Sequence, residues 1–495
     1  MEKAKTKLKE FILKNRAEVI FVSLIILAGL FLRLYRIEGF LTFLGDEGRD
    51  VRIVRDLLRG NLIFIGPQTS IGNMYLGPLY YYMMAPALFL SRLSPVGPAV
   101  MTAILGTLTV FLTWLIGRSW FGKTAGLIAA LLFALSPVAI IYSRSSWNPN
   151  PMPFFALISI WAIWKVYAEK KFAYLSLSAL SLGAALQMHY LGLLLVPTLG
   201  IFWLLTARSL KEKKLFVRHT LLAIGLFLLL MSPLALFDLK HDGMNFKAFK
   251  AFFSDRQTTV NLNPLRSDRF GLVLSKVTSD MVLSRQNNIS LVVGLILILA
   301  FVFVLIKNKK HKIYWLLASW LFFGFLGLAV YKQHVYAHYY GFIYPAIYFL
   351  LGITLAYFLK TNLIAKIASA ILLIYLVYLS LAFSPTKDQP NRQLARTQEV
   401  VRLIMKEAGD KTFNFGLIAK QNYDESYRYF LENYNAKMVR GEDKITDQLF
   451  VVCEDGDKCQ PEGNPAYQVA IFGPSHVVDT WQIDYIKIYR LLHSQ

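Results

Sequence analysis

Charged residues are scarce in this sequence, and cysteine is scarcer still. Of its 495 residues, 17% are Asp, Glu, Lys or Arg, whereas proteins average about 25%. Two cysteines are too few for a disulfide scaffold, and a hydrophobic share of 55% excludes a disordered chain. A water-soluble globule of this composition would lack the polar side chains that cover a surface. The composition therefore predicts a mainly α-helical, polytopic membrane protein.

Long apolar runs are abundant, and they supply the predicted spans. A helix needs about 20 mostly apolar residues to cross the hydrocarbon core of a bilayer. The segment 78–91 is shorter and contains Pro86, so we interpret it as an interfacial or re-entrant helix. We predict about eleven transmembrane helices, at 17–35, 96–117, 124–143, 152–168, 172–188, 190–206, 219–237, 289–306, 313–331, 338–358 and 366–383.

The excess of basic residues follows this topology. The formal net charge is +22, and Lys and Arg gather in the short segments that lie inside if the N-terminus is cytoplasmic. The short outer loops hold two, Arg144 and Lys332. This asymmetry obeys the positive-inside rule, and it argues against nucleic acid as a partner. We therefore predict a multi-pass protein of the plasma membrane with a retained first span and an outer C-terminal domain.

In this topology, three polar regions lie on the outer side of the membrane. Residues 36–95 and 238–288 form two extracytoplasmic loops of a membrane domain at 1–383, and residues 384–495 form a soluble α/β domain. In this domain Cys453 and Cys459 are close enough in sequence to form a disulfide in an oxidising exterior, and zinc is the weaker alternative. We predict helices at Gln389–Ala408 and Asp424–Asn433, and strands at Phe413–Ala419, Phe450–Cys453 and Tyr467–Phe472.

The densest ionisable cluster beside the membrane runs from Gly45 to Asp56, shortly after the first span. Asp46 stands where a helix N-cap would, with the helix continuing from Arg49. Asp46 and Arg49 share a helix face at i,i+3, whereas the adjacent Glu47 diverges by about 100°. An amphipathic helix lying on the bilayer would explain the cluster without any function. However, placing a carboxylate beside a membrane cavity costs free energy, so a carboxylate found there favours a functional role.

Asp46-Glu47-x-Arg49 resembles the Asp-Glu motif of the GT-C glycosyltransferases, and it lies at the equivalent place in the first outer loop. The protein O-mannosyltransferases and the lipid A aminoarabinose transferases are the most similar groups. The resemblance extends over most of residues 17–383 and does not reach the tail. Further similar segments are Gly77-Pro78-Leu79-Tyr80-Tyr81-Tyr82, Tyr142-Ser-Arg-Ser-Ser-Trp-Asn-Pro149 and His338-Tyr-Tyr-Gly-Phe-Ile-Tyr-Pro345.

This resemblance implies a GT-C fold and an inverting sugar transfer at the outer face of the membrane. The implied donor is a polyprenyl-phosphate sugar, and the acceptor hydroxyl belongs to a lipid, a protein or a glycan. Asp46 is implied as the base and Arg49 as a phosphate contact. We predict Glu47 as a second catalytic residue, which orients the site. A hydroxyl needs a base during attack, and a departing phosphate needs cations and hydrogen-bond donors.

The sequence departs from these relatives at two places. The aminoarabinose transferases carry a Lys before a Pro-Pro-Leu turn, where this chain reads Met74-Tyr-Leu-Gly-Pro78. Lys240 and His241 are therefore predicted to contact the donor phosphate, together with His338 and Tyr339, although a basic loop or an aromatic belt would also place such residues there. Where relatives often carry an acidic residue, this chain has Asn148 and Asn150. With Arg144 and Tyr81, these are predicted to contact the acceptor or the sugar.

Transport is the main alternative to this interpretation, ahead of a polymerase or ligase of lipid-linked glycans and a scaffold role for the tail, and metal binding is a separate possibility. His334 and His338 are spaced i,i+4, which permits one shared helix face, but no further ligands converge in the sequence. We assign no metal site and leave a divalent metal open. A transporter or flippase would carry ionisable residues near mid-span. This chain concentrates them at the outer ends of its spans instead.

Overall fold

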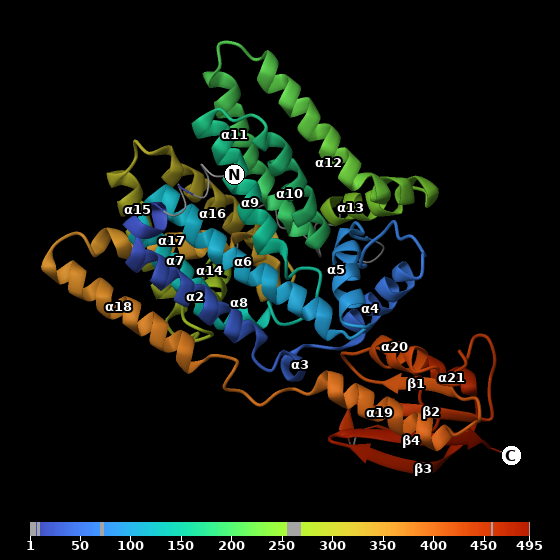
Figure 1. Ribbon diagram of the computed structural model, residues 1–495. Coiled ribbons are helices and arrows are strands. Elements are labelled where there is room, and N and C mark those ends of the chain that lie inside the picture. The colour runs from blue at the N-terminus through green and yellow to red at the C-terminus, as the bar shows by residue number, and fades with distance from the viewer. Residues whose placement is uncertain (1–5, 7–9, 70–73, 255–268, 457–458, 495) are drawn as a thin grey trace.

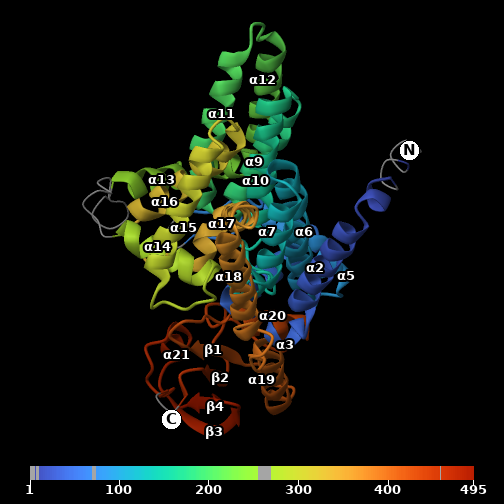
Figure 2. The ribbon, with the colours of Figure 1, turned by 90° about the vertical axis from the view of Figure 1, so that its left-hand side faces the viewer.

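The computed structural model describes residues 6, 10–69, 74–254, 269–456 and 459–494. Helices form a long bundle, and a small sheet with its own helices lies at one end of it (Figures 1 and 2). A mainly helical chain with a small C-terminal α/β unit was predicted, and the structure confirms it.

Within the described residues, eight helical segments are long and apolar enough to cross a membrane. The most enclosed of them is η3 with α17, which packs against α7 and α9 in the centre of the bundle. The least enclosed is α12, whose apolar side chains face outward. The eight are α2 (Arg16–Leu34), α6 (Val96–Phe121), η1 (Tyr190–Leu195) with α11 (Val196–Ser209), α12 (Lys214–Lys240), α15 (Ser290–Lys307), α16 (Lys312–Val330), η3 (Ala337–Ile343) with α17 (Tyr344–Phe358) and α18 (Leu363–Ala382).

Three other predicted spans are shorter or less apolar, so the count of eleven is not confirmed. They correspond to α7 (Lys123–Leu135), α9 (Met152–Glu169) and α10 (Tyr174–Met188). The predicted span at 124–143 breaks at Ser136-Pro137, because the Ser136 hydroxyl accepts a hydrogen bond from the Ala139 N–H and starts a new helix, α8 (Pro137–Ile141).

The two predicted outer loops are largely helical. The first contains α3 (Ile37–Phe40), α4 (Gly45–Leu58) and α5 (Leu79–Leu90), and Pro86 lies inside α5. The second contains α13 (Met244–Ser254) and α14 (Arg269–Met281), while its residues 255–268 lie outside the described part of the chain. Which side of the membrane these loops occupy stays a prediction.

The C-terminal unit contains a four-stranded sheet in the order β1-β2-β4-β3. The first pair is parallel and the other two pairs are antiparallel. Cys453 and Cys459 form a disulfide, with their Cα atoms 6.1 Å apart. The elements are α19 (Gln393–Ala408), β1 (Asn414–Ile418), α20 (Glu425–Asn433), β2 (Gln448–Cys453), α21 (Tyr467–Phe472), β3 (Ser475–Ile483) and β4 (Ile486–His493).

One predicted strand of this unit is wrong. Tyr467–Phe472 is the helix α21, and Val469 and Phe472, three residues apart, are the side chains that it buries against the sheet. The strands β3 and β4 were not predicted. Their exposed faces carry polar residues, so no apolar run marks them, although burial alternates along β3 and along the first residues of β4, as in a half-buried hairpin.

Candidate functional site

The helix α4 begins one turn earlier than the sequence suggested. Gly45 is its first residue and Asp46 lies inside the first turn, so the prediction of Asp46 as N-cap is wrong. Glu47 does the capping instead, because its Oε2 accepts a hydrogen bond from the Leu44 N–H at 3.0 Å. Glu47 is consequently buried, while the Asp46 side chain keeps 42% of its surface exposed.

Arg49 lies between two carboxylates. Its Nη1 donates to Asp46 Oδ1 at 2.9 Å, and its Nε and Nη2 donate to Asp50 Oδ1 at 2.9 and 2.7 Å. Asp50 is completely buried and also accepts a hydrogen bond from the Tyr81 hydroxyl at 3.0 Å. Its Oδ2 is buried without a partner among the described residues. Asp50 was not among the predicted site residues, yet it fixes the guanidinium that holds Asp46.

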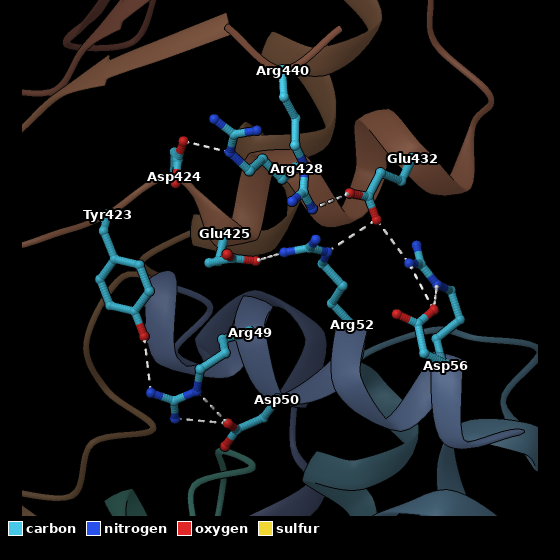
Figure 3. A network of polar contacts seen from close by, with 11 residues as sticks. Arg49, Asp50, Arg52, Asp56, Tyr423, Asp424, Glu425, Arg428, Glu432 and Arg440 are labelled. Atoms are coloured by element: carbon cyan, nitrogen blue, oxygen red, sulfur yellow. Dashed lines mark hydrogen bonds and ion pairs between the residues drawn. The ribbon is translucent and has the colours of Figure 1, made fainter. Parts of the chain in front are cut away.

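The C-terminal unit reaches this cluster through Asn422 and Tyr423. The Tyr423 hydroxyl donates to Asp46 Oδ1 at 2.6 Å. It accepts from Arg49 Nη1 at 3.2 Å (Figure 3). Asn422 Oδ1 accepts from the Gly45 N–H at 2.8 Å. Asp46 is therefore oriented by its own helix and by the C-terminal unit together.

Two glycines allow this close approach of α4 and the C-terminal unit. A Cβ on Gly48 would lie 2.3 Å from the backbone nitrogen of Ser426, and a Cβ on Gly45 would lie 2.5 Å from the Tyr423 ring. Without side chains at these positions, α4 and α20 pack backbone to backbone.

Ion pairs border the glycine contact between the same two helices. Arg52 bonds Glu425 at 2.6 Å and Glu432 at 3.1 Å, and Arg55 bonds Glu432 at 2.7 Å (Figure 3). These charges come from chain segments about 380 residues apart, and they hold the C-terminal unit on the membrane domain.

A first cavity of about 380 Å³ opens beside Asp46. It brings together five predicted site residues from separate elements, namely Asp46, Arg49, Asn148, His338 and Tyr339. Aromatic rings form much of its wall, with Trp147 and His338 4.3 Å apart and His189 and Tyr339 4.9 Å apart between ring centres. The other lining residues are Gln68, Thr69, Leu76, Tyr142, Trp147, Pro149, His189, Tyr190 and Tyr336.

A second cavity, of about 330 Å³, also has Asp46 in its wall. It shares Asp46, Tyr142 and Trp147 with the first cavity, so these three side chains form the boundary between the two. The predicted residues Glu47 and Asn150 also line it. Its remaining lining residues are Thr42, Leu44, Gly45, Ile141, Ser145, Gln421, Asn422 and Tyr423.

Four predicted site residues are not brought to either cavity wall. Tyr81 lies behind the site and bonds Asp50, and Arg144 is buried, where it donates to the Tyr35 carbonyl and covers the Phe40 ring. Lys240 and His241 are exposed at the end of α12, and His241 contacts the Phe237 ring and carbonyl. The phosphate-binding role of Lys240 and His241 stays a prediction.

The described residues show no group of three or more His, Cys, Asp or Glu side chains placed to hold a metal ion. His334 precedes η3 and does not share a helix face with His338, which lines the first cavity. We assign no step of the chemistry to a metal.

Burial raises the pKa of two carboxyls beneath this site. The pKa of Glu47 rises to about 8, although the Leu44 N–H partly opposes the shift. The pKa of Asp50 rises to about 6, because burial outweighs the attraction of Arg49. In the folded protein both carboxyls hold their protons at a pH where the unfolded chain releases them. The stability that they contribute is therefore complete at low pH, below the unfolded pKa values.

Glu47→Gln is expected to reduce the pH dependence of stability. From the Glu47 values, stability falls as the pH rises from about 4.5 to about 8, by a few kcal/mol, since one pKa unit corresponds to about 1.4 kcal/mol. Gln still accepts from Leu44 but cannot ionise. Melting temperatures between pH 4.5 and 8.5 would measure this effect, with the exposed Glu38→Gln as control. Equal slopes for Glu47→Gln and the wild type would contradict the assignment.

Comparison with known proteins adds a partial sequence match. The family described as "Dolichyl-phosphate-mannose-protein mannosyltransferase" matches residues 76–237. YkcB of Bacillus subtilis (strain 168), provisionally named a mannosyltransferase, is 27% identical over 123 residues. That alignment covers 25% of this chain and 17% of YkcB, so the chain matches a small part of the relative's length.

Solved structures match over much more of the chain. ArnT from Cupriavidus metallidurans, bound to undecaprenyl phosphate, has a TM-score of 0.63 at 12% identity, covering 96% of this chain and 97% of ArnT. AglB from Archaeoglobus fulgidus, in complex with an inhibitory peptide and a dolichol-phosphate, has a TM-score of 0.56 at 12% identity, covering 84% of this chain and 64% of AglB. At this identity the likeness establishes the fold. The chain therefore shares its fold with ArnT and AglB, and residues 76–237 are similar to a mannosyltransferase family.

Proposed function

We propose that this protein is an inverting glycosyltransferase that moves a sugar from a polyprenyl-phosphate donor to an acceptor hydroxyl at the outer face of the plasma membrane. The observation that carries the proposal is the position of Asp46. Its carboxylate stands at the boundary of two cavities, and Arg49 and Tyr423 both bond its Oδ1. Its Oδ2 has no hydrogen-bond partner within the described part of the chain, so it is available to take a proton.

The chemistry needs one base and a stabilised leaving group. The acceptor oxygen attacks the anomeric carbon and forms the new glycosidic bond, while the acceptor proton passes to Asp46. The bond from the anomeric carbon to the phosphate oxygen breaks, and its electron pair leaves with the polyprenyl phosphate. Attack opposite to the leaving group inverts the anomeric centre. Arg49, in the wall of the first cavity, supplies positive charge for the departing phosphate.

The first cavity fits a lipid-linked donor. A smaller apolar cavity of about 100 Å³ adjoins it at Tyr190 and is lined mainly by Leu, Phe and Val side chains of η1, α13 and α16, including Leu194, Phe249 and Val330. An isoprenoid segment there would place its phosphate near the aromatic wall. Undecaprenyl phosphate in ArnT and dolichol-phosphate in AglB, which share the fold, support the same class of donor.

A transfer assay with the purified full-length protein tests this proposal. Polyprenyl-monophosphate sugars, beginning with the mannosyl form, would be supplied with mixed acceptors, and release of polyprenyl phosphate would be measured with the anomeric configuration of the product. We expect enzyme-dependent release and an inverted product. Movement of a lipid or solute across vesicles without consumption of any such donor would instead support a transporter, and a retained configuration would exclude the single displacement.

A further inference from the structure

The second cavity is built jointly by the membrane domain and the C-terminal unit. The start of α4 forms one wall, the chain after α8 forms another, and residues 421–423 form a third. Because Tyr423 bonds both Asp46 and Arg49, the C-terminal unit contributes directly to the surroundings of the base. A ligand in this cavity would meet both parts of the protein.

The lining of this cavity has no basic side chain among the described residues and is rich in hydrogen-bonding groups. Thr42, Ser145, Asn150 and Gln421 offer hydroxyls and amides, and Trp147 offers an aromatic ring. No Lys or Arg belongs to the described lining, and its two ionisable carboxyls are Asp46 and Glu47. The cation nearest to Asp46, Arg49, is outside this lining and is already paired with Asp46 and Asp50, so an anionic group in the cavity would meet the Asp46 carboxylate, which is electrostatically unfavourable.

Among the described residues, Asn150 keeps a hydrogen-bond acceptor without a partner at this cavity. Its Nδ2 donates to the Ser145 carbonyl at 2.8 Å, which fixes the amide. Its Oδ1 is buried and accepts no hydrogen bond in the part of the chain that the structure describes. A buried acceptor without a partner costs about 1–3 kcal/mol, and a ligand hydroxyl would remove this cost.

We propose that the second cavity is the acceptor site and that the acceptor is a neutral carbohydrate. This inference rests on the proposed transferase function and specifies its acceptor. Hydroxyls of a sugar match the amide and hydroxyl lining, and the apolar face of a sugar ring packs on Trp147. An acceptor hydroxyl in this cavity would lie beside Asp46, which also borders the donor cavity. The bonds made and broken are those given above.

Acceptor selectivity tests the inference. The purified full-length protein would receive the donor that it consumes, with three acceptor probes: a neutral oligosaccharide glycoside, the same glycoside bearing a phosphate monoester, and a Ser/Thr peptide. We expect kcat/KM for the neutral glycoside to exceed the other two by at least about tenfold, or about 1.4 kcal/mol. Asn150→Ala should raise KM for the neutral glycoside several-fold with less effect on kcat.

A positive charge introduced into the cavity should change the preference between the neutral and the phosphorylated glycoside. Gln421→Lys should reduce the preference for the neutral over the phosphorylated glycoside by about tenfold, because it places a cation in the lining. Gln460→Lys, on the exposed surface of the same unit, is the matched control and should leave the preference unchanged. Preference of the wild type for the phosphorylated glycoside or the peptide would overturn the inference, as would equal behaviour of the two Lys variants.

Direct binding separates this inference from the proposed function. Calorimetry of the neutral glycoside with wild type and Asn150→Ala requires no turnover. If no polyprenyl-phosphate sugar is consumed but the glycoside binds and Asn150→Ala weakens it, the transferase proposal fails and the carbohydrate site stands. If donor is consumed but only a charged acceptor is glycosylated, the transferase proposal stands and the acceptor inference fails.

Discussion

Asp46→Asn is expected to lower the rate of sugar transfer by about 10²–10⁴-fold, the usual contribution of a positioned general base. Asn retains a carbonyl oxygen that can accept from Arg49 and Tyr423, so the local geometry should persist. It cannot take the acceptor proton, and the loss should therefore fall mainly on kcat. Initial rates at saturating donor and acceptor would measure it.

Asp56→Asn is the matched control for this substitution. Asp56 lies on the same helix with a similar exposed fraction, 38% against 42%, but it lines neither cavity. Its replacement should leave kcat within about twofold, as for most surface positions. Polyprenyl phosphate should bind Asp46→Asn and wild type with similar affinity. Wild-type turnover by Asp46→Asn would remove Asp46 from the mechanism.

Gly48→Ala is expected to detach the C-terminal unit from α4 and to reduce transfer strongly. The added Cβ would lie 2.3 Å from a backbone nitrogen of α20, and backbone cannot move aside as a side-chain tip can. Overpacking of this kind costs about 1–3 kcal/mol, which shifts the docked equilibrium by about 5- to 150-fold. Activity should fall because undocking withdraws Tyr423 from Asp46 and opens the second cavity.

Limited trypsin digestion would measure the undocking. Lys387 is exposed between α18 and α19, and its cleavage should accelerate in Gly48→Ala. Gly225→Ala is the control, because a Cβ there meets nothing within 4 Å on the outward-facing helix α12. Equal proteolysis and equal transfer by the two variants would show that the contact between α4 and α20 is not needed.

Local sequence was enough to predict that Asp46 and Arg49 lie together, and both line the first cavity. Asp46 and Arg49 are three residues apart, and a helix places such residues on one face whatever the rest of the chain does. The same rule separated Glu47 from Asp46, and Glu47 is indeed buried while Asp46 faces the cavities. The start of α4 was misplaced because Asp is a common N-cap, whereas here the side chain of Glu47 satisfies the backbone of Leu44.

The spacing of residues along one helix could not identify contacts of Asp46 that are far from it in the sequence. Tyr423 meets Asp46 across 377 residues of chain, in a segment for which the family resemblance offered no guidance. A signal did exist in Gly45 and Gly48, since two glycines at the start of an otherwise regular helix mark a close approach, but it does not name the partner. Asp50 was passed over because a carboxylate beside an Arg on a polar helix usually faces solvent.

The sequence by itself determined that this chain spans a membrane and that a carboxylate–guanidinium pair follows the first span. Both depend on short-range quantities, namely the length of apolar runs and the spacing of residues along one helix. Only the tertiary structure decided that this carboxylate separates two cavities and that the C-terminal unit completes one of them. Such contacts join segments hundreds of residues apart, and the packing of the whole chain, rather than any local preference, brings them together.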